Sequence, residues 1–406
     1  MNKKYNVLDY DVKPNAEYLQ TELFQKVIDV CRENGGGEIV VPKGNYRIGS
    51  IRLYSDMTLH LLEGAKLQGS TDYRDYEDFH VPSTLGYLKD DHYIKIWNLP
   101  SYYIYGIICA FGEKNVSIIG EKDSCINGND CRDENGEERF RGPMGIILSR
   151  CEHIRLEGYS FINSANWSHQ MDSCKGISIS NVKIQGGHDG FNLHHCDDIE
   201  VADCTLETGD DCFAGYDIQN LHVKNCYMNT ACNGLRIGGY HLIFENCVFE
   251  GPGHYPHLSE NTYYTHALFK YYSIRPDHIR KEGEKIVIRN SVIKDVDMLF
   301  SYQYGKEELM QNNKPLRELV LENCRISGVK KAGQLRGNGE TCTLIMKNIA
   351  CDMEAGTTIL ETDECVKLVL ENVYCTQNVK IKAAKQPEQI RCSNIEIVQE
   401  NKNEAI

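Results

Sequence analysis

Four segments decide the fold: ISISNVKI (177–184), IEVADCTL (199–206), LHVKNCYM (221–228) and LIFENCVF (242–249), which start at nearly equal intervals along the chain. Each segment alternates apolar and polar residues and then places Asn or Asp at its fifth position. Such alternation is typical of a β-strand with one buried face, and Asn tolerates the left-handed backbone of a tight bend. Each segment therefore predicts a strand that ends in a bend.

The same unit recurs on both sides of these segments. IRLEGYSF begins at Ile154, and IVIRNSVI, LVLENCRI, LIMKNIAC and LVLENVYC begin at Ile286, Leu319, Leu344 and Leu368. The step from Leu242 to Ile286 is twice the usual interval, so one coil there either lacks the clear pattern or carries an insertion. The predicted bend residues are Asn181, Asp203, Asn225, Asn246, Asn290, Asn323, Asn348 and Asn372. The cysteines that follow four of these bends are expected to stack inside the protein: Cys204, Cys226, Cys247 and Cys324.

A period of about 22 residues predicts a solenoid in which each repeat is one coil. β-branched residues, Asn and Cys dominate the repeat, whereas a leucine-rich repeat needs regularly spaced Leu and usually a helix in each unit. We therefore expect an all-β fold, a single-stranded right-handed parallel β-helix with one repeat in each coil, that forms a single domain over residues 1–406.

The segments outside the repeat are predicted to form a cap and two long loops. TELFQKVIDVCREN (21–34) has apolar residues at helical spacing, which predicts a helix with Thr21 as its N-cap and Gly35–Gly37 at its end. This helix belongs to a capping region over about residues 1–40 that covers the open end of the β-helix. The segments at about 71–108 and 250–285 interrupt the period, and such loops often shape the binding site of a solenoid.

The composition argues against several classes of partner. The formal net charge is −14 and the basic residues do not cluster, which argues against nucleic acid and against an anionic membrane. The chain has no run of ~18 apolar residues, and its start, MNKKYNVLDYDVK, lacks the apolar core of a signal peptide. We therefore expect a cytoplasmic protein whose 18 Cys are reduced and mostly buried. No CxxC pair is matched by a second one, so a structural zinc site is not expected.

The repeat period also groups the acidic residues. Asp189, Asp211 and Asn233 follow one another at this period, and Asp210 stands beside Asp211. Trp167 lies one period before Asp189 and would edge the same row. Three clustered carboxylates repel one another, which raises the pKa of one or more of them and suits a general acid beside a general base. A calcium site and an incidental surface cluster are the alternatives, although no calcium-loop pattern is present.

Motifs along most of the chain resemble those of glycoside hydrolase family 28, the polygalacturonase family of right-handed β-helices. The resemblance rests on YNVLDYDVK (5–13), GGGEIVVPKGNYRIGSIRLYSDMTLHLLEGAKLQGS (35–70) and INSANWSH (162–169). Members of that family typically carry Asn-Thr-Asp, Asp-Asp, Gly-His-Gly and Arg-Ile-Lys, and the three Asp are their catalytic carboxylates.

This chain keeps only part of those four motifs. The first motif is Gly187-His188-Asp189, the second is Gly209-Asp210-Asp211, and the third is Cys232-Asn233-Gly234, where Asn233 replaces the His of the family. The fourth motif is only partly kept. Lys270 matches its Lys, Leu268 stands in the place of its Arg, and Arg236 offers a cation from a neighbouring position. His188 is a partial substitute for the lost His. These departures indicate a different or decorated sugar as the substrate in place of galacturonan itself.

The resemblance implies hydrolysis of a glycosidic bond in a pectin-type or related oligosaccharide by inversion. Asp210 would be the general acid, and Asp189 and Asp211 would activate water. The expected substrate contacts are His188, Asn233, Arg236, Lys270 and Trp167, and no cofactor or metal is expected. Adjacent coils lie about 4.8 Å apart, whereas inverting sites usually separate their carboxyls by roughly 6.5–9.5 Å, so the spacing alone does not predict inversion.

Exo action is expected because the two long loops could close one end of the cleft and because a cytoplasmic enzyme would meet short oligosaccharides. The alternatives are a polysaccharide lyase, another β-helix enzyme such as a transferase or epimerase, and a non-catalytic carbohydrate-binding protein. The oligomeric state is left open by the sequence.

Overall fold

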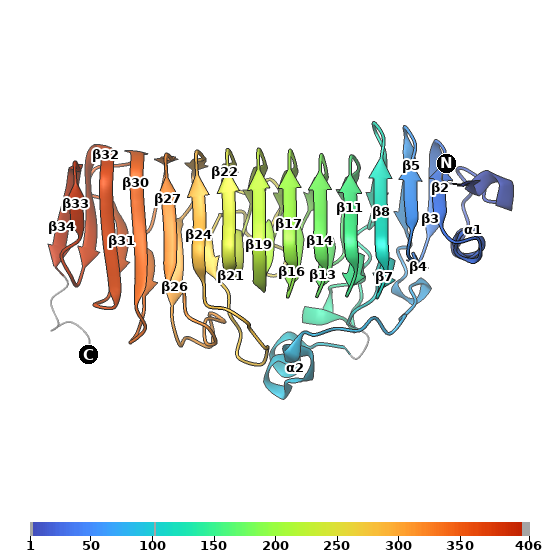
Figure 1. Cartoon of the computed structure of the whole chain (residues 1–406), viewed down its shortest axis with the longest axis horizontal. Helices are drawn as coiled ribbons and strands as arrows, with labels where there is room; N and C mark the ends of the chain where they lie inside the picture. The colour runs from blue at the N-terminus through green and yellow to red at the C-terminus, as the bar shows by residue number, and fades with distance from the viewer. Residues whose placement is uncertain (1–2, 101–102, 400–406) are drawn as a thin grey trace. The chain divides into compact units, whose positions relative to one another are not determined.

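The computed structural model describes residues 3–100 and 103–399, and the chain forms two compact units. The first unit comprises Met1–Thr208 with Leu258–Glu260, and the second comprises Gly209–His257 with Asn261–Ile406. In each unit, strands of successive coils pair in parallel (Figure 1). The predicted right-handed parallel β-helix is confirmed.

The strands of the first unit stack into three parallel faces. The first face contains β1 (Lys4–Asn6), β2 (Gly37–Val41), β5 (Met57–Leu61), β8 (Lys114–Gly120), β11 (Glu152–Glu157), β14 (Lys175–Ser180) and β17 (Asp197–Ala202). The second contains β3 (Gly44–Ile48), β6 (Ala65–Gly69), β9 (Cys125–Asn127), β12 (Ser160–Ile162), β15 (Lys183–Gly186) and β18 (Thr205–Thr208). The third contains β4 (Ile51–Arg52), β7 (Gly106–Phe111), β10 (Met144–Ser149), β13 (His169–Asp172) and β16 (Phe191–His194).

The second unit has the same three faces. Its long strands β19 (Phe213–Lys224) and β21 (Asn233–Glu245) pair with each other and run from the third face into the first. The first half of β21 pairs with β23 on the third face, and its second half pairs with β24 on the first face. Its first face has β24 (Glu284–Arg289), β27 (Glu318–Glu322), β30 (Cys342–Asp352), the first part of β32 (Val366–Ala383) and β33 (Glu388–Ile390), whereas β34 (Ser393–Gln399) pairs mainly with the end of β32 on the third face. The second has β20 (Tyr227–Thr230), β22 (Val248–Glu250), β25 (Val292–Lys294) and β28 (Arg325–Ser327); the third has β23 (Ala267–Tyr271), β26 (Met298–Gln303), β29 (Gly333–Arg336) and β31 (Thr358–Thr362).

Helix α1 (Thr21–Glu33) packs against β2, β3 and β4 as the predicted cap, and buries Phe24, Val27, Ile28 and Cys31. The cap region also contains β1, which already pairs with β2. The helix ends at the predicted place, where Gly35 has a left-handed φ of 79° and the Gly36 N–H bonds to the Cys31 carbonyl.

The prediction that Thr21 is the N-cap of α1 is wrong. The N-cap is Gln20, and Thr21 is the first helical residue. The Thr21 hydroxyl accepts a hydrogen bond of 2.8 Å from the Gly49 N–H, so it joins the helix to the connection between β3 and β4. The predicted cap position is wrong by one residue because this long-range bond uses the hydroxyl.

The remaining helices are short. They are α2 (Asp91–Trp97), η1 (Val7–Tyr10), η2 (Tyr73–Asp75), η3 (Gly86–Lys89) and η4 (Glu137–Arg139), of which α2, η2 and η3 lie in the predicted loop at 71–108. Among the described residues, none of the helices has the length and apolar character needed to span a bilayer.

The predicted bends are confirmed at all eight positions. Their residues have φ between 52° and 56°, in the left-handed region that Asn and Asp tolerate better than other side chains: Asn181, Asp203, Asn225, Asn246, Asn290, Asn323, Asn348 and Asn372. The four cysteines after the bends are buried, and each thiol donates to the carbonyl two residues earlier: Cys204, Cys226, Cys247 and Cys324. The cysteines therefore pack as expected.

In the last coils the bend residues form a hydrogen-bonded ladder. The Asn323 amide donates to Asn290 at 3.0 Å, Asn348 donates to Asn323 at 2.8 Å, and Asn372 donates to Asn348 at 2.9 Å. Each inner Asn therefore stabilises both its own left-handed turn and the contact with the neighbouring coils.

We expect Asn348→Ala to destabilise the protein by about 2 kcal/mol, because two side-chain hydrogen bonds are lost and Ala is sterically disfavoured in the left-handed turn. Asn348→Gly removes the same bonds but suits the backbone, so its loss should be about half as large. Urea unfolding of the two variants measures the difference. Equal stability of both variants and the wild type would contradict a structural role for the ladder.

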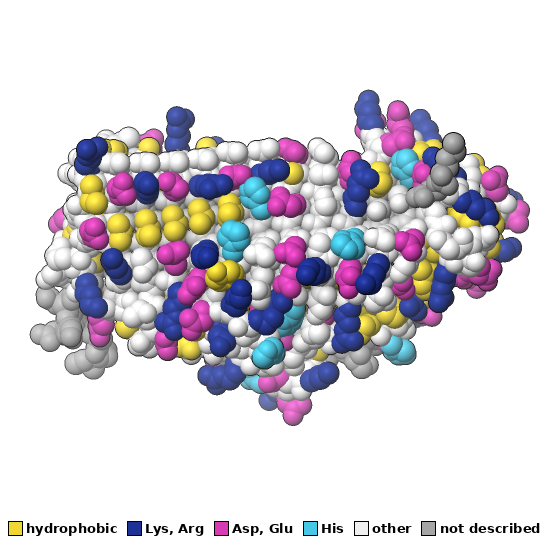
Figure 2. Space-filling model, viewed as in Figure 1, with side chains coloured by type: hydrophobic (Ala, Val, Ile, Leu, Met, Phe, Trp, Pro, Cys, Tyr) yellow, Lys and Arg dark blue, Asp and Glu magenta, His cyan; other side chains and the backbone are white. Residues whose placement is uncertain are grey.

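Outward side chains are also in register from coil to coil. Figure 2 shows an apolar row beside a row of alternating charge on the C-terminal coils. The apolar row contains Ile243, Val287, Val320, Ile345 and Val369, and the charged row contains Glu245, Arg289, Glu322, Lys347 and Glu371. Within the charged row, Arg289 pairs with Glu245 at 2.6 Å and Lys347 pairs with Glu322 at 3.5 Å. Opposite charges thus replace the repulsion that a stacked row of like charges would cause.

The doubled step of the repeat is one coil with an insertion. Leu242 of β21 is the direct register partner of Ile286 of β24, so no coil lies between them. The predicted loop at 250–285 is wrong for residues 267–271, which form β23 and pair with both β21 and β26. This strand was missed because the insertion before it removes the regular spacing and because it lacks the Asn bend.

Candidate active site

The acidic pair of the second unit lies in the turn that precedes β19. The Asp211 N–H donates to the Asp210 carboxylate at 3.2 Å. Thr230 holds this turn from the next coil, because its buried hydroxyl donates to the Asp210 carbonyl and accepts from the Cys232 N–H at 2.9 Å. The carboxylate oxygens of Asp210 and Asp211 lie within 4.8 Å of each other, which is close enough for one charge to disfavour the other.

Asp211 is the more buried of the two carboxylates. Only 2% of its side chain is exposed, compared with 14% for Asp210. As the period predicts, Asn233 lies beside it from the next coil, and both its backbone N–H and its side-chain amide donate to Asp211 Oδ1, at 3.2 and 2.7 Å. Burial and the nearby charge of Asp210 raise the pKa of Asp211, and Arg236, Asn233 and Lys270 act in the opposite direction.

We expect Asp211→Asn to raise the melting temperature at pH 7. The folded-state pKa of Asp211 lies above its unfolded value, so folding takes up a proton between the two values and stability falls as the pH rises through that window. The substituted side chain keeps an oxygen that can accept the hydrogen bond from the Asn233 amide, but it carries no charge. The gain measured by calorimetry should shrink as the pH falls toward 3.8, the ordinary pKa of the group. A lower melting temperature at pH 7 would contradict this expectation.

Two cations lie side by side next to these carboxylates. Arg236 of β21 and Lys270 of β23 are direct register partners. The Arg236 guanidinium lies 3.7 Å from Asp211 Oδ2 and 4.0 Å from the centre of the Tyr272 ring, and it donates to Met310 Sδ. Burial and the charge of Arg236 lower the pKa of Lys270. Among the residues that the structure describes, Lys270 forms no ion pair, although the charges of Asp211 and Asp210 act on it.

A histidine that the sequence did not single out also belongs to this site. His257 lies in the insertion between β22 and β23, and its Nε2 is 3.6 Å from Asp210 Oδ1. A bridge to Thr262 holds its backbone in place. Cys232, which precedes β21, lies near the same two side chains, so Asp210, Cys232 and His257 could together offer oxygen, sulfur and nitrogen ligands to a metal ion. The only sequence signal was the His-rich composition of the insertion.

The other predicted site residues belong to the first unit. Asp189 is 4% exposed and accepts a 2.7 Å hydrogen bond from the Asn192 amide, and the His188 ring stacks on Phe140. Trp167 is 8% exposed, and its ring meets the Tyr103 ring edge-on and stacks on the His194 ring. The roles of Asp189, His188 and Trp167 toward a substrate stay predictions.

Taken alone, the arrangement in the second unit can exchange a proton and hold an anion. It contains a partly exposed carboxyl, a buried carboxyl with a raised pKa, an imidazole next to the exposed carboxyl and two cations within the same few side chains. Carboxyl pairs with different environments are typical of sites that use one acid and one base.

Comparison with known proteins relates this chain to glycoside hydrolases. The exo-poly-alpha-D-galacturonosidase of Dickeya chrysanthemi is 34% identical over 138 residues, which are 34% of this chain and 20% of that protein. The match thus spans one fifth of the length of that relative.

Two solved structures share the fold. The family 28 exopolygalacturonase of Yersinia enterocolitica has a TM-score of 0.67 at 17% identity, over 95% of this chain and 79% of that one. The hyperthermoactive exopolygalacturonase of Thermotoga maritima has a TM-score of 0.64 at 16% identity, over 92% of each chain. The model of glycosyl hydrolases family 28 matches residues 31–240, just over half of the sequence. The chain therefore belongs to glycosyl hydrolases family 28.

Proposed function

We propose that this protein is a glycosidase that hydrolyses a glycosidic bond in a pectin-type oligosaccharide next to an acidic sugar. The observation that carries the proposal is the adjacency of Arg236 and Lys270, whose cations lie beside the Asp210–Asp211 pair. Two cations side by side repel each other and suit a ligand that brings a carboxylate. A uronic acid residue is such a ligand, and the names of the relatives refer to polygalacturonan.

In the proposed reaction, Asp210 protonates the leaving oxygen. Its carboxyl is the more exposed of the pair, and His257 Nε2 lies 3.6 Å from its Oδ1. Asp211 removes a proton from the attacking water. Burial raises the pKa of Asp211, which makes its ionised form the stronger base, and the Asn233 amide orients that carboxylate.

Asp189 is proposed as a further carboxylate that acts on the water. The support comes from the repeat spacing and from the motif that it matches in family 28. The same family membership supports inversion at the anomeric carbon. A proton NMR spectrum of the first product, taken before mutarotation, separates inversion from retention.

We propose exo action on short oligosaccharides in the cytoplasm. The names of three relatives refer to exo-acting enzymes, and two long segments interrupt the coils, 70–105 between β6 and β7 and 251–266 between β22 and β23. All 18 cysteines lie within the described residues and none forms a disulfide, and 15 of them are buried, which suits a reducing compartment. Release of single sugars, and not of a ladder of internal fragments, is the expected product pattern.

The test is incubation of the purified protein with oligogalacturonides, their methyl esters and neutral pectic oligosaccharides. We expect new reducing ends with the acidic substrates and no ultraviolet absorbance from an unsaturated sugar. An unsaturated product whose formation stops in chelator would support a lyase instead. Binding without any new reducing end would support a carbohydrate-binding protein.

A further inference from the structure

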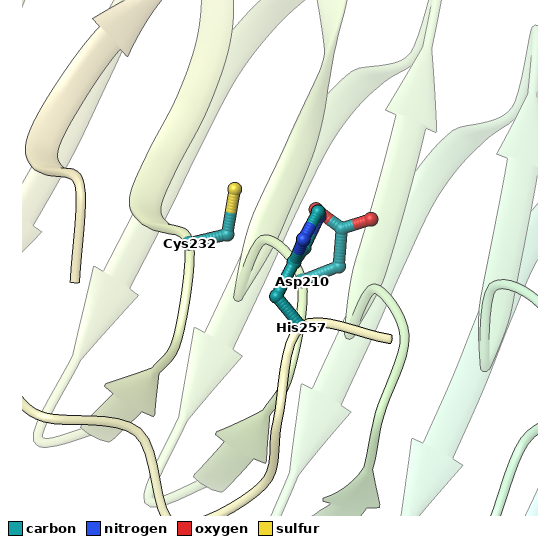
Figure 3. A group of neighbouring side chains, drawn as sticks. All are labelled: Asp210, Cys232 and His257. Atoms are coloured by element: carbon teal, nitrogen blue, oxygen red, sulfur yellow. The ribbon is translucent and has the colours of Figure 1, made fainter. Parts of the chain in front are cut away.

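A second chemical feature of the site is the cluster formed by Asp210, Cys232 and His257. Figure 3 shows that the three side chains come from separate segments of the chain and that the imidazole lies beside the Asp210 carboxylate. One ligand atom from each residue lies within 4.8 Å of the other two, and His257 Nε2 is 3.6 Å from Asp210 Oδ1. The glycosidase reaction proposed above uses neither the Cys232 thiol nor a metal ion.

This donor set matches one class of cation. A carboxylate oxygen, a cysteine sulfur and an imidazole nitrogen suit Zn²⁺ and chemically similar ions such as Co²⁺, whereas Ca²⁺ and Mg²⁺ prefer oxygen alone. Tetrahedral zinc with ligands at about 2.0–2.3 Å separates its ligand atoms by roughly 3.3–3.7 Å. The His257–Asp210 separation already has this value, and small side-chain rotations would bring in the sulfur.

Hydrogen bonds from neighbouring residues hold the cluster in place. Thr230 bonds to the backbone of both Asp210 and Cys232 and so fixes their spacing. The Asn233 amide donates to Cys232 Sγ at 3.2 Å, a contact that stabilises a metal-bound thiolate. Among the described residues, no hydrogen-bond partner is found for His257 Nδ1, although this atom is buried. That nitrogen is distinct from Nε2, which is the ring atom that lies beside Asp210 and faces the cluster.

The cluster can be reached from solvent. The side chains of Asp210 and His257 are 14% and 11% exposed, and Cys232 is 8% exposed. With three protein ligands, a fourth position on the ion remains for water.

We propose that Asp210, Cys232 and His257 bind one zinc-type divalent cation and that the bound cation inhibits the enzyme. The ion would occupy the Asp210 carboxylate, which then cannot carry the proton for the leaving oxygen. The inhibitory part rests on the proposed glycosidase function, whereas the binding part does not. Removal of the ion by a chelator would restore the free carboxyl.

The binding part is tested by titrating the fully reduced protein with Co²⁺. We expect one equivalent to bind with a sulfur-to-cobalt charge-transfer band in the near ultraviolet, and Zn²⁺ to displace it. Cys232→Ser should abolish the band, and His257→Gln should weaken cobalt binding at least about tenfold, since one of three protein ligands is lost. Cys212→Ser is the matched control, because Cys212 is also a buried cysteine, stands beside Asp211 and lies outside the cluster.

No band in the wild type, or a band that survives Cys232→Ser and disappears in Cys212→Ser, would overturn the site. Circular dichroism of each variant separates lost binding from lost folding. These readouts need no turnover, so they test the site even if the protein hydrolyses no oligosaccharide.

The inhibitory part is tested on activity with the acidic substrates. Zinc should inhibit the wild type and the Cys212→Ser variant reversibly, and chelator should restore both. Cys232→Ser should need at least about tenfold more zinc than the wild type for the same fractional inhibition, because the strongest ligand is absent. The inhibition of each variant is measured against its own zinc-free rate. Zinc-dependent activation, or equal sensitivity of wild type and Cys232→Ser, would overturn the inhibitory role.

Discussion

Asp210→Asn is expected to lower kcat by about a thousandfold or more, because general acid catalysis typically contributes about 10²–10⁴-fold and Asn cannot supply a proton. The fold should persist, since Asn retains an oxygen for the Asp211 N–H and the Asp210 backbone remains bonded to Thr230. Initial rates of reducing-end release from oligogalacturonides measure the loss.

A substrate with a good leaving group sharpens this test. A nitrophenyl glycoside needs little protonation of its leaving oxygen, so Asp210→Asn should retain much more of its activity on that substrate than on the natural linkage. Asp211→Asn should lose activity on both, because the attacking water then lacks the base that removes its proton. Equal losses with both substrates for Asp210→Asn would contradict its role as the acid.

The matched control is Asp198→Asn. Asp198 lies at the start of β17 with a left-handed backbone, its side chain is 49% exposed, and its partner is Lys175 at 3.8 Å. An exposed pair of this kind contributes little to stability, so the variant should keep both its activity and its melting temperature.

Arg236→Gln and Lys270→Gln should each lower kcat/KM for an acidic oligosaccharide by about 10–100-fold. The loss of one hydrogen bond between charged groups is worth about 1.5–3 kcal/mol, and each step of about 1.4 kcal/mol is a factor of ten. The loss should be much smaller with the methyl ester of the same oligosaccharide, which has no carboxylate to bind. The ratio of kcat/KM for acid and ester is therefore the measurement.

The two cations also differ in one expected result. Arg236 lowers the pKa of Asp211 more than Lys270 does, so Arg236→Gln should shift the acidic limb of the pH–rate profile to higher pH. Arg289→Gln and Lys294→Gln are the controls, because each removes a cation of the second unit that pairs with an outer-surface glutamate. If Arg236→Gln reduced activity equally with acid and ester, its role would be confined to Asp211 and would not include the substrate.

The sequence predicted the fold because every coil repeats the same local chemistry. The bend at Asn323 and the bend at Asn348 need a left-handed residue for the same reason, so the pattern is visible one repeat at a time. The same period correctly paired Asp211 with Asn233, because no insertion separates their coils. The N-cap of α1 was misplaced by one residue, since its position depends on a hydrogen bond to Gly49 and not on local propensity alone.

The tertiary structure decides where Arg236, Lys270 and His257 lie relative to the carboxylates. A long insertion lies between the strands of Arg236 and Lys270, and a spacing that differs from the period predicts no register. His257 reaches Asp210 from within that insertion, where no repeat constrains the chain. A periodic sequence determines which residues stack, since the strand spacing is the same in every coil. The path of an insertion depends instead on long-range packing, so only the folded chain brought His257 and Lys270 to the carboxylates.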